Sequence, residues 1–205
     1  MLDATARKII DRPLNWMGAR LAARGVTANQ VTLAGLVLGL AAAGLIGFGL
    51  HLAALLLLLA SRLADGLDGA VARASRQTDF GGYLDIAADF LFYGAIPMAF
   101  VMSDPAGNGA AGAFLLTSFY FNGTSFLGFA VLAEKKQMQT DARGVKSLYF
   151  TGGLLEGTET IAFFVALCLF PAWFAPLAWI FGSLCFVTAV SRILLARRVF
   201  PDVAP

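Results

Sequence analysis

Asp65-Gly-Leu-Asp-Gly-Ala-Val-Ala-Arg73 and Gly81-Gly-Tyr-Leu-Asp-Ile-Ala-Ala-Asp89 are the two stretches around which this chain is organised. Together they place four carboxylates in an otherwise apolar sequence. A carboxylate inside a membrane helix costs about 2.5–3.5 kcal/mol on insertion scales and needs compensation. On helices the first two acids share a face as i and i+3, and the last two share a face as i and i+4. The two pairs are predicted to converge on an antiparallel helix pair and to bind cations.

The composition outside these stretches is that of a polytopic membrane protein. The chain has 205 residues, of which 59% are hydrophobic and 14% are charged, and its mean hydropathy is +0.75. Six apolar segments approach the roughly 20 residues that a membrane-crossing helix needs: 31–50, 52–75, 82–102, 109–133, 150–170 and 173–195. We therefore predict an all-α fold, in which residues 27–195 form a bundle of six transmembrane helices. With short connections between them, residues 1–205 make a single membrane domain.

The N-terminal residues 1–24 have a different pattern. Ile9, Leu14 and Leu21 belong to an apolar series at helical spacing that arginines and aspartates oppose, and Pro13 interrupts it. This pattern is typical of an amphipathic helix that lies on the membrane surface. The segment lacks the apolar core of a cleavable signal peptide, so we expect none here.

The basic residues indicate how the chain is oriented. They gather at 7–24, 73–76, 135–146 and 192–198, whereas the alternate connections contain no lysine or arginine. By the positive-inside rule, both termini and the acidic motif lie on the cytoplasmic side. The net charge of only +2 does not suggest a nucleic-acid partner.

The residue types around the acids predict the ligand. Carboxylate oxygens favour hard cations such as Mg²⁺ or Mn²⁺, and four of them suffice for two ions about 3.5–4 Å apart. Gly69, Ala72 and Gly81 are small enough to let a bulky ligand approach the backbone, and Arg73 supplies a forked donor for phosphate oxygens. A diphosphate ligand fits this set. The alternative is a purely structural set of ion pairs, for example between Asp65 and Arg62 or Arg73.

The pattern DxxDGxxAR…GxxxDxxxD resembles the signature of the CDP-alcohol phosphatidyltransferase family at every fixed position. The six predicted spans and the amphipathic N-terminal helix also resemble that family, so the resemblance covers most of the chain. Within the family the chain is most similar to a bacterial inner-membrane branch for which no acceptor alcohol is established. The resemblance implies an integral membrane enzyme of phospholipid biosynthesis that forms homodimers.

The resemblance also implies roles for particular residues. The four motif acids would coordinate Mg²⁺ or Mn²⁺, and Asp89 would in addition be the general base on the acceptor hydroxyl. The CDP group would be held by Asp65, Asp68, Gly69, Ala72, Arg73 and Gly81, with Thr32 as a further nucleotide contact. The expected reaction transfers a phosphatidyl group from CDP-diacylglycerol, or another CDP-alcohol, to an alcohol acceptor and releases CMP.

Two polar groups outside the motif are candidates for binding the acceptor. Lys135, Lys136, Arg143 and Lys146 could bind a phosphorylated acceptor, or they could be ordinary positive-inside residues. Glu156 and Glu159 could recognise the acceptor, or they could pair with nearby cations such as Arg192. The sequence leaves both alternatives open.

Four smaller features complete the predictions. Asn122 and Ser125, at i and i+3, are expected either to hydrogen-bond between helices or to line a substrate cavity. Gly35-x-x-x-Gly39 indicates a close helix contact, the two cysteines are expected to be buried structural thiols, and the turn residues of 102–112 predict an exposed loop.

Two other functions remain possible at this stage. Membrane prenyltransferases also bind a diphosphate through acids on helices, but they place them in separate halves of a longer bundle. A divalent-cation transporter would use the acids for the transported ion. Metal flux without nucleotide would favour the transporter, and CMP production would favour the transferase.

Overall fold

The computed structural model describes residues 3–136, 155 and 157–200, with side chains from residue 11 onward. In these residues it contains seven α-helices and one 3₁₀ helix, and no strand, which confirms the all-α prediction for the described part of the chain. The elements are α1 (Asp3–Ala23), α2 (Ala28–Gly47), α3 (His51–Ala74), α4 (Asp79–Ser103), α5 (Pro105–Lys135), α7 (Gly157–Leu169), η1 (Pro171–Trp173) and α8 (Phe174–Val199).

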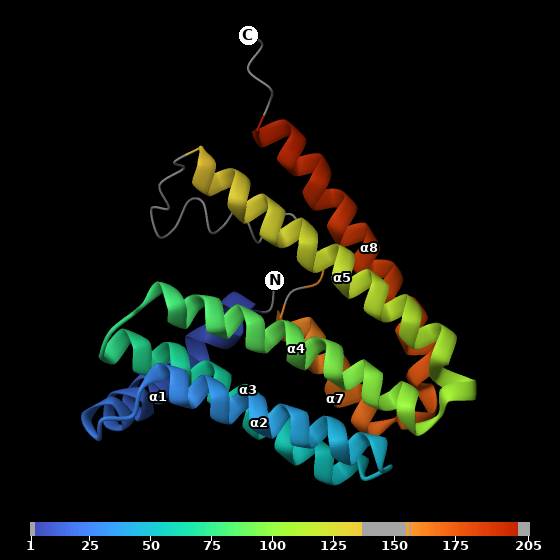
Figure 1. The fold of residues 1–205 in the computed structure, drawn as a ribbon, viewed down its shortest axis with the longest axis horizontal. Helices are drawn as coiled ribbons and strands as arrows, with labels where there is room; N and C mark the ends of the chain where they lie inside the picture. Colours follow the sequence, from blue (N-terminus) through green and yellow to red (C-terminus); the bar gives the residue numbers. More distant parts are fainter. Residues whose placement is uncertain (1–2, 137–154, 156, 201–205) are drawn as a thin grey trace.

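The helices pack in two groups (Figure 1). α2 contacts α3 and α4, and α1 lies against α3. α5 and α8 form a second pair, which runs away from the first group toward the C-terminus. α5 also contacts α4, and α7 contacts α3, so both groups meet around α4 and α7. This arrangement places the acidic residues of α3 and α4 where the two groups come together.

Side-chain caps explain where several helices begin. Thr27 and Gln30 form a reciprocal capping box at the start of α2, as the sequence predicts for Thr27. The Thr78 hydroxyl accepts a hydrogen bond from the Gly81 amide at the start of α4. At the next junction Asp104 accepts from the Gly107 amide, and Pro105 occupies the first turn of α5. The predicted loop at 102–112 is therefore wrong, because this cap and proline start a helix directly after α4.

Among the residues that the structure describes, four elements are long and apolar enough to cross a membrane: α2, α4, α5, and the segment Pro171–Val199 that includes α8. α3 has 24 residues and is long enough to span. However, it contains Arg62 and the first two motif acids, which are more charged residues than an ordinary transmembrane helix has. α7 has 13 residues and is about 20 Å long, shorter than the roughly 30 Å apolar core of a bilayer. The predicted fifth span, 150–170, falls partly outside the described residues. The structure thus supports a membrane protein with four candidate spans, and the prediction of six is not confirmed.

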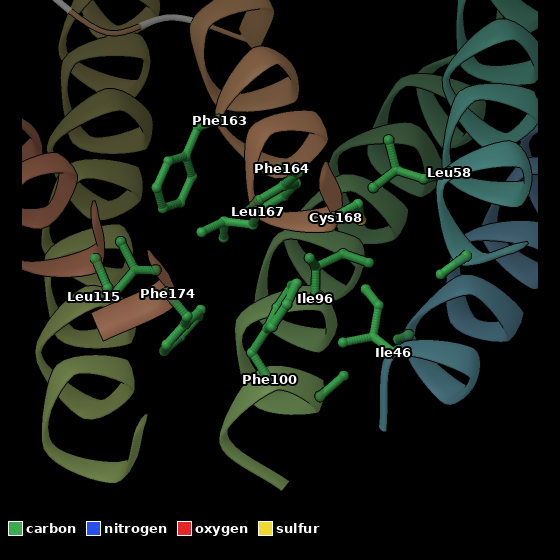
Figure 2. Packing of buried hydrophobic residues seen from close by; sticks show 14 of the residues in the cluster. Ile46, Leu58, Ile96, Phe100, Leu115, Phe163, Phe164, Leu167, Cys168 and Phe174 are labelled. Carbon is green, nitrogen blue, oxygen red and sulfur yellow. The ribbon is translucent and has the colours of Figure 1, made fainter. Parts of the chain in front are cut away.

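The main apolar core lies between α2, α3, α4, α5, α7 and α8, at the end of the bundle away from α1. Figure 2 shows Ile46 and Leu58 facing Ile96, Phe100 and Leu167 across this core. Phe164 packs on Phe92 with ring centroids 5.8 Å apart. Cys168 and Cys185 are buried free thiols in the described core, as the sequence predicts.

The Gly35-x-x-x-Gly39 motif of α2 is a close helix contact, as predicted. A Cβ on Gly35 would lie 3.1 Å from the Ala64 Cβ on α3, and a Cβ on Gly39 would lie 2.6 Å from the Phe92 ring on α4. The Ser61 hydroxyl of α3 donates a hydrogen bond of 2.7 Å to the Gly35 carbonyl. Small residues that allow backbones to approach are a main source of helix association in membranes.

Gly39→Ala is therefore expected to destabilise the protein. The added methyl group meets Phe92, whose side chain is fully buried and has no room to move. Overpacking of this kind costs about 1–3 kcal/mol, which lowers the unfolding midpoint by roughly 2–10 °C in a protein of this size. A thiol-reactive fluorophore that reports exposure of Cys168 and Cys185 on heating measures the midpoint in detergent.

Gly44→Ala is the matched control. Gly44 lies on the same helix, and a Cβ there meets nothing within 4 Å. Its midpoint should stay within about 2 °C of the wild type or rise slightly, because alanine favours the helix. Equal midpoints for the two variants would contradict the close α2–α4 contact.

Candidate active site

Three motif acids meet where α3 and α4 pack together. One carboxylate oxygen each from Asp65, Asp68 and Asp85 lie within 4.8 Å of one another. The first two share a face of α3, and the third comes from α4, as the i and i+3 spacing and the predicted antiparallel pair require. Oxygen ligands at such mutual distances suit one hard divalent cation. The residues present therefore fit a Mg²⁺ or Mn²⁺ ion, and no other donor type belongs to this group.

Thr32 of α2 joins this group from a third helix. Its hydroxyl donates a hydrogen bond of 2.6 Å to Asp68 Oδ2, and both side chains are buried. A hydrogen bond to the second oxygen of a carboxylate fixes the orientation of the first, as partners of metal ligands commonly do. The predicted nucleotide contact is thus found beside a motif acid.

Asp89, the fourth motif acid, has a different partner. Its Oδ1 lies 2.8 Å from Arg62 Nη1, which is also 3.6 Å from Asp65 Oδ1. Among the described residues, the group of carboxylates close enough to share one ion does not include Asp89. The ion pair between Arg62 and Asp65, which the sequence offered as a structural alternative, is therefore present, and it extends to Asp89.

A cavity of about 820 Å³ opens on one side of the carboxylates. Asp68 and Asp85 line it, together with the starts of α2 and α4. The predicted small residues Gly69, Ala72 and Gly81 also line it. Two helix N-termini bring partial positive charge to this cavity, which favours a phosphate-bearing ligand. We call it the polar cavity.

A second cavity, of about 580 Å³, opens on the other side between α4, α5, α7 and α8. Asp65 and Asp89 line it, so the four acids are divided between the two cavities. Much of its wall is aromatic or aliphatic, including Phe90, Tyr93 and Phe119. We call it the aromatic cavity.

Arg192 of α8 forms the polar end of the aromatic cavity. Its guanidinium donates to the Asn122 side chain at 2.9 Å and to the Ser125 hydroxyl at 2.6 Å, both on α5. The predicted hydrogen bond of Asn122 between helices is confirmed. Asn122 also lines this cavity, and a role in a substrate cavity stays a prediction. Arg192 and Tyr93 line this cavity although the sequence did not indicate either as a cavity residue. The i and i+3 spacing of Asn122 and Ser125 was the available signal, but the helix facing them could not be inferred from it.

The remaining predicted site residues lie apart from the carboxylates or outside the described residues. Arg73 is exposed, and its guanidinium donates at 2.9 Å to the Asn15 side chain of α1. Lys135 and Lys136 are exposed at the end of α5, about three turns beyond Ser125. Glu159 lies in the first turn of α7, whose Thr158 and Thr160 line the aromatic cavity. Outside the described residues lie Arg143, Lys146 and Glu156.

The chain is similar to several known proteins. The family model for CDP-alcohol phosphatidyltransferase matches residues 25–195. The inner membrane protein YnjF of Escherichia coli K12 is 50% identical over 169 residues, which is 82% of either chain. The archaetidylinositol phosphate synthase of Pyrococcus horikoshii is 36% identical over 86 residues, which is 42% of this chain and 46% of that protein.

One solved structure has the same fold. The phosphatidylinositol phosphate synthase PgsA1 of Mycobacterium tuberculosis, crystallised with CDP-DAG bound, superposes with a TM-score of 0.68. The match covers 95% of this chain and 100% of the other, at 20% sequence identity. At this identity the likeness establishes the fold alone.

Proposed function

The chain belongs to the CDP-alcohol phosphatidyltransferase family of membrane transferases, and on this premise we propose that it transfers a phosphatidyl group from CDP-diacylglycerol to an alcohol, with release of CMP. The observation that carries the proposal is the position of the motif acids. Asp68 and Asp85 line one cavity and Asp65 and Asp89 line the other, so a donor and an acceptor could approach neighbouring carboxylates from two separate cavities.

The polar cavity is the proposed site of the CDP group. The starts of α2 and α4 and the small side chains of Gly69, Ala72 and Gly81 line it. A Cβ on Gly81 would lie 3.0 Å from the Thr78 hydroxyl and 3.1 Å from the Asn29 side chain, so a larger residue would crowd this wall. Arg73, exposed next to the cavity, would reach the diphosphate after leaving Asn15.

Asp65, Asp68 and Asp85 would hold a divalent cation, Mg²⁺ or Mn²⁺, beside the donor diphosphate. Such an ion, when bound, neutralises charge on phosphate oxygens and on the departing CMP. The sequence predicts four ligands and two ions, and Asp89 as a fourth ligand stays a prediction, because that carboxylate is paired with Arg62.

Asp89 is the proposed general base. It lines the aromatic cavity, from which the acceptor would approach. Its carboxylate would take the proton of the acceptor hydroxyl while the acceptor oxygen forms a bond to the donor phosphorus and the bond to CMP breaks. The pairing with Arg62 fixes the carboxylate before the acceptor arrives, and positioning of this kind lowers the barrier to reaction.

The acceptor would occupy the aromatic cavity. Arg192, Asn122 and Thr158 would provide polar contacts there, beside aromatic walls. Recognition of the acceptor by other residues stays a prediction for the full set named from the sequence: Lys135, Lys136, Arg143, Lys146, Glu156 and Glu159.

The proposal includes the arrangement in the cell. Four candidate spans together with α3 and the predicted span 150–170 would make six. The basic connections would place the active site and both termini on the cytoplasmic side of a bacterial inner membrane. α1 would lie on that surface, and two chains would form a homodimer.

A lipid-product analysis tests the proposal. Purified protein in detergent is incubated with CDP-diacylglycerol, Mn²⁺ and one acceptor at a time: glycerol 3-phosphate, inositol, inositol phosphate, serine or phosphatidylglycerol. Mass spectrometry of the lipids should show one new phosphodiester lipid whose headgroup matches one acceptor. A soluble CDP-alcohol as the only accepted donor would contradict the lipid donor, and metal flux into liposomes without nucleotide would support the transporter.

Thr32→Val should weaken the proposed ion site. The substitution keeps the volume but removes the hydroxyl that donates to Asp68. Loss of a hydrogen bond to a metal ligand typically lowers metal affinity by about 10–100-fold. Titration of the purified protein with Mn²⁺, followed by electron paramagnetic resonance (EPR), measures the affinity. Thr32→Ser retains the hydroxyl and should stay within about threefold of the wild type; equal weakening by both variants would show that the hydrogen bond is not the cause.

A further inference from the structure

Arg62 is a buried cation inside the acidic motif. Its side chain is 10% exposed, and Nη1 lies 2.8 Å from Asp89 and 3.6 Å from Asp65. It thus neutralises charge on one acid of each motif helix. Asp65 also belongs to the group of three acids, since one carboxylate oxygen each from Asp65, Asp68 and Asp85 lie within 4.8 Å of one another.

The position of the guanidinium is fixed by neutral neighbours as well. Its central carbon lies 3.8 Å from the centre of the Phe92 ring, a cation–π contact. Nη2 donates at 3.3 Å to Ser61, whose hydroxyl is itself bonded to the backbone of α2. Phe92 and Ser61 are fully buried and both lie against Gly39 of α2. The guanidinium therefore occupies a built pocket at the junction of three helices.

This pocket lies where a second cation would have to bind. Two ions that share carboxylates lie about 3.5–4 Å apart, so the second would use Asp65 together with Asp89. Arg62 Nη1 already lies between these two acids. A guanidinium and a divalent ion on the same pair of carboxylates would repel each other, because both carry positive charge.

We propose that Arg62 takes the place of a second divalent cation, so that the site of this chain binds one ion, at Asp65, Asp68 and Asp85. Arg62 is then a positioning residue that holds Asp89 toward the aromatic cavity. The inference rests on the proposed function for the ion site, and it differs from the two-ion expectation drawn from the sequence.

Counting bound Mn²⁺ tests the inference without relying on activity. The full-length protein in detergent is equilibrated with Mn²⁺, and the bound metal is measured by dialysis and by EPR. The wild type should bind one ion per chain and give the signal of an isolated Mn²⁺. Arg62→Met, which keeps the apolar stem but removes the charge, should bind two ions with the spin-coupled signal of a close pair.

Arg62→Lys is the matched variant, because it keeps the positive charge and should still bind one ion. Misfolding of Arg62→Met is checked by its first ion: if that ion binds with wild-type affinity, the site of Arg62→Met is intact. Two coupled ions in the wild type, or one ion in both the wild type and a folded Arg62→Met, would overturn the inference. If the wild type bound no Mn²⁺, both the inference on Arg62 and the proposed ion site would be wrong. The proposed function is tested separately, by CMP release.

Discussion

Asp89→Asn should lower the rate of CMP release by about 10²–10⁴-fold, the usual contribution of a general base. The amide has nearly the same shape as the carboxylate but does not take the acceptor proton. It still accepts a hydrogen bond from Arg62, so the packing of α3 and α4 is retained. Because Asp89 lies outside the group of three acids that would share an ion, Mn²⁺ affinity should change by less than about threefold. The measurement is the initial rate of acceptor-dependent CMP release, together with a Mn²⁺ titration.

Asp104→Asn is the matched control for this substitution. Asp104 caps α5 at the opposite end of α4, and asparagine caps a helix as well as aspartate does. Its CMP release should stay within about twofold of the wild type. If Asp89→Asn were as active as this control, another group would have to be the base. If it lost Mn²⁺ as well, Asp89 would be a metal ligand and the inference on Arg62 would fail.

Asp68→Asn should have a comparable effect on activity through a different step. Asp68 is buried, lines the polar cavity and belongs to the group of three acids. An amide is a weaker ligand for a hard cation than a carboxylate. Losing several kcal/mol of metal stabilisation corresponds to about 10²–10³-fold in rate. Mn²⁺ affinity should fall by at least about tenfold, which separates this variant from Asp89→Asn.

High Mn²⁺ concentration provides a check on this explanation. Saturating metal should restore part of the CMP release of Asp68→Asn and none of that of Asp89→Asn. The unfolding midpoint, read from the two buried cysteines, shows whether each protein is folded. Wild-type Mn²⁺ affinity in Asp68→Asn would contradict the assignment of this acid to the ion site.

The acidic site could be predicted from the sequence because helix geometry alone brings its parts together. The i and i+3 spacing of Asp65 and Asp68 fixes one face of α3, and a short polar turn returns the chain along α4. The small residues Gly69 and Gly81 then line a cavity whichever helix closes it. The hydrogen bond between Thr32 and Asp68 also depends on the position of α2 and was not predicted; the family resemblance indicated Thr32 only as a nucleotide contact.

Contacts between elements distant in the sequence could not be predicted. Arg62 reaches Asp89, 27 residues away, rather than Asp65 alone. Arg73, expected at the diphosphate, instead meets Asn15 of α1, 58 residues away. The partner that each arginine contacts depends on how the helices are rotated about their axes, and helix packing determines that rotation. The same holds for Arg192, whose partners on α5 became visible only with the pairing of α5 and α8.

Local signals also competed with one another. The glycine- and asparagine-rich segment after α4 predicted a loop, yet the Asp104 cap and Pro105 start α5 there. In α3, the charged residues of the site prevent the helix from meeting the hydropathy and charge criteria of a transmembrane span. The site needs carboxylates on this helix, whereas insertion into a membrane is less favourable with them; this is typical of functional acids in membranes.

CMP release by the purified protein, with CDP-diacylglycerol, Mn²⁺ and the acceptor panel, tests the central claim most directly. The account predicts CMP production that depends on one acceptor and on divalent metal, and that falls at least about 10²-fold in Asp89→Asn. A folded wild-type protein that binds Mn²⁺ but releases no CMP with any donor and acceptor would contradict it.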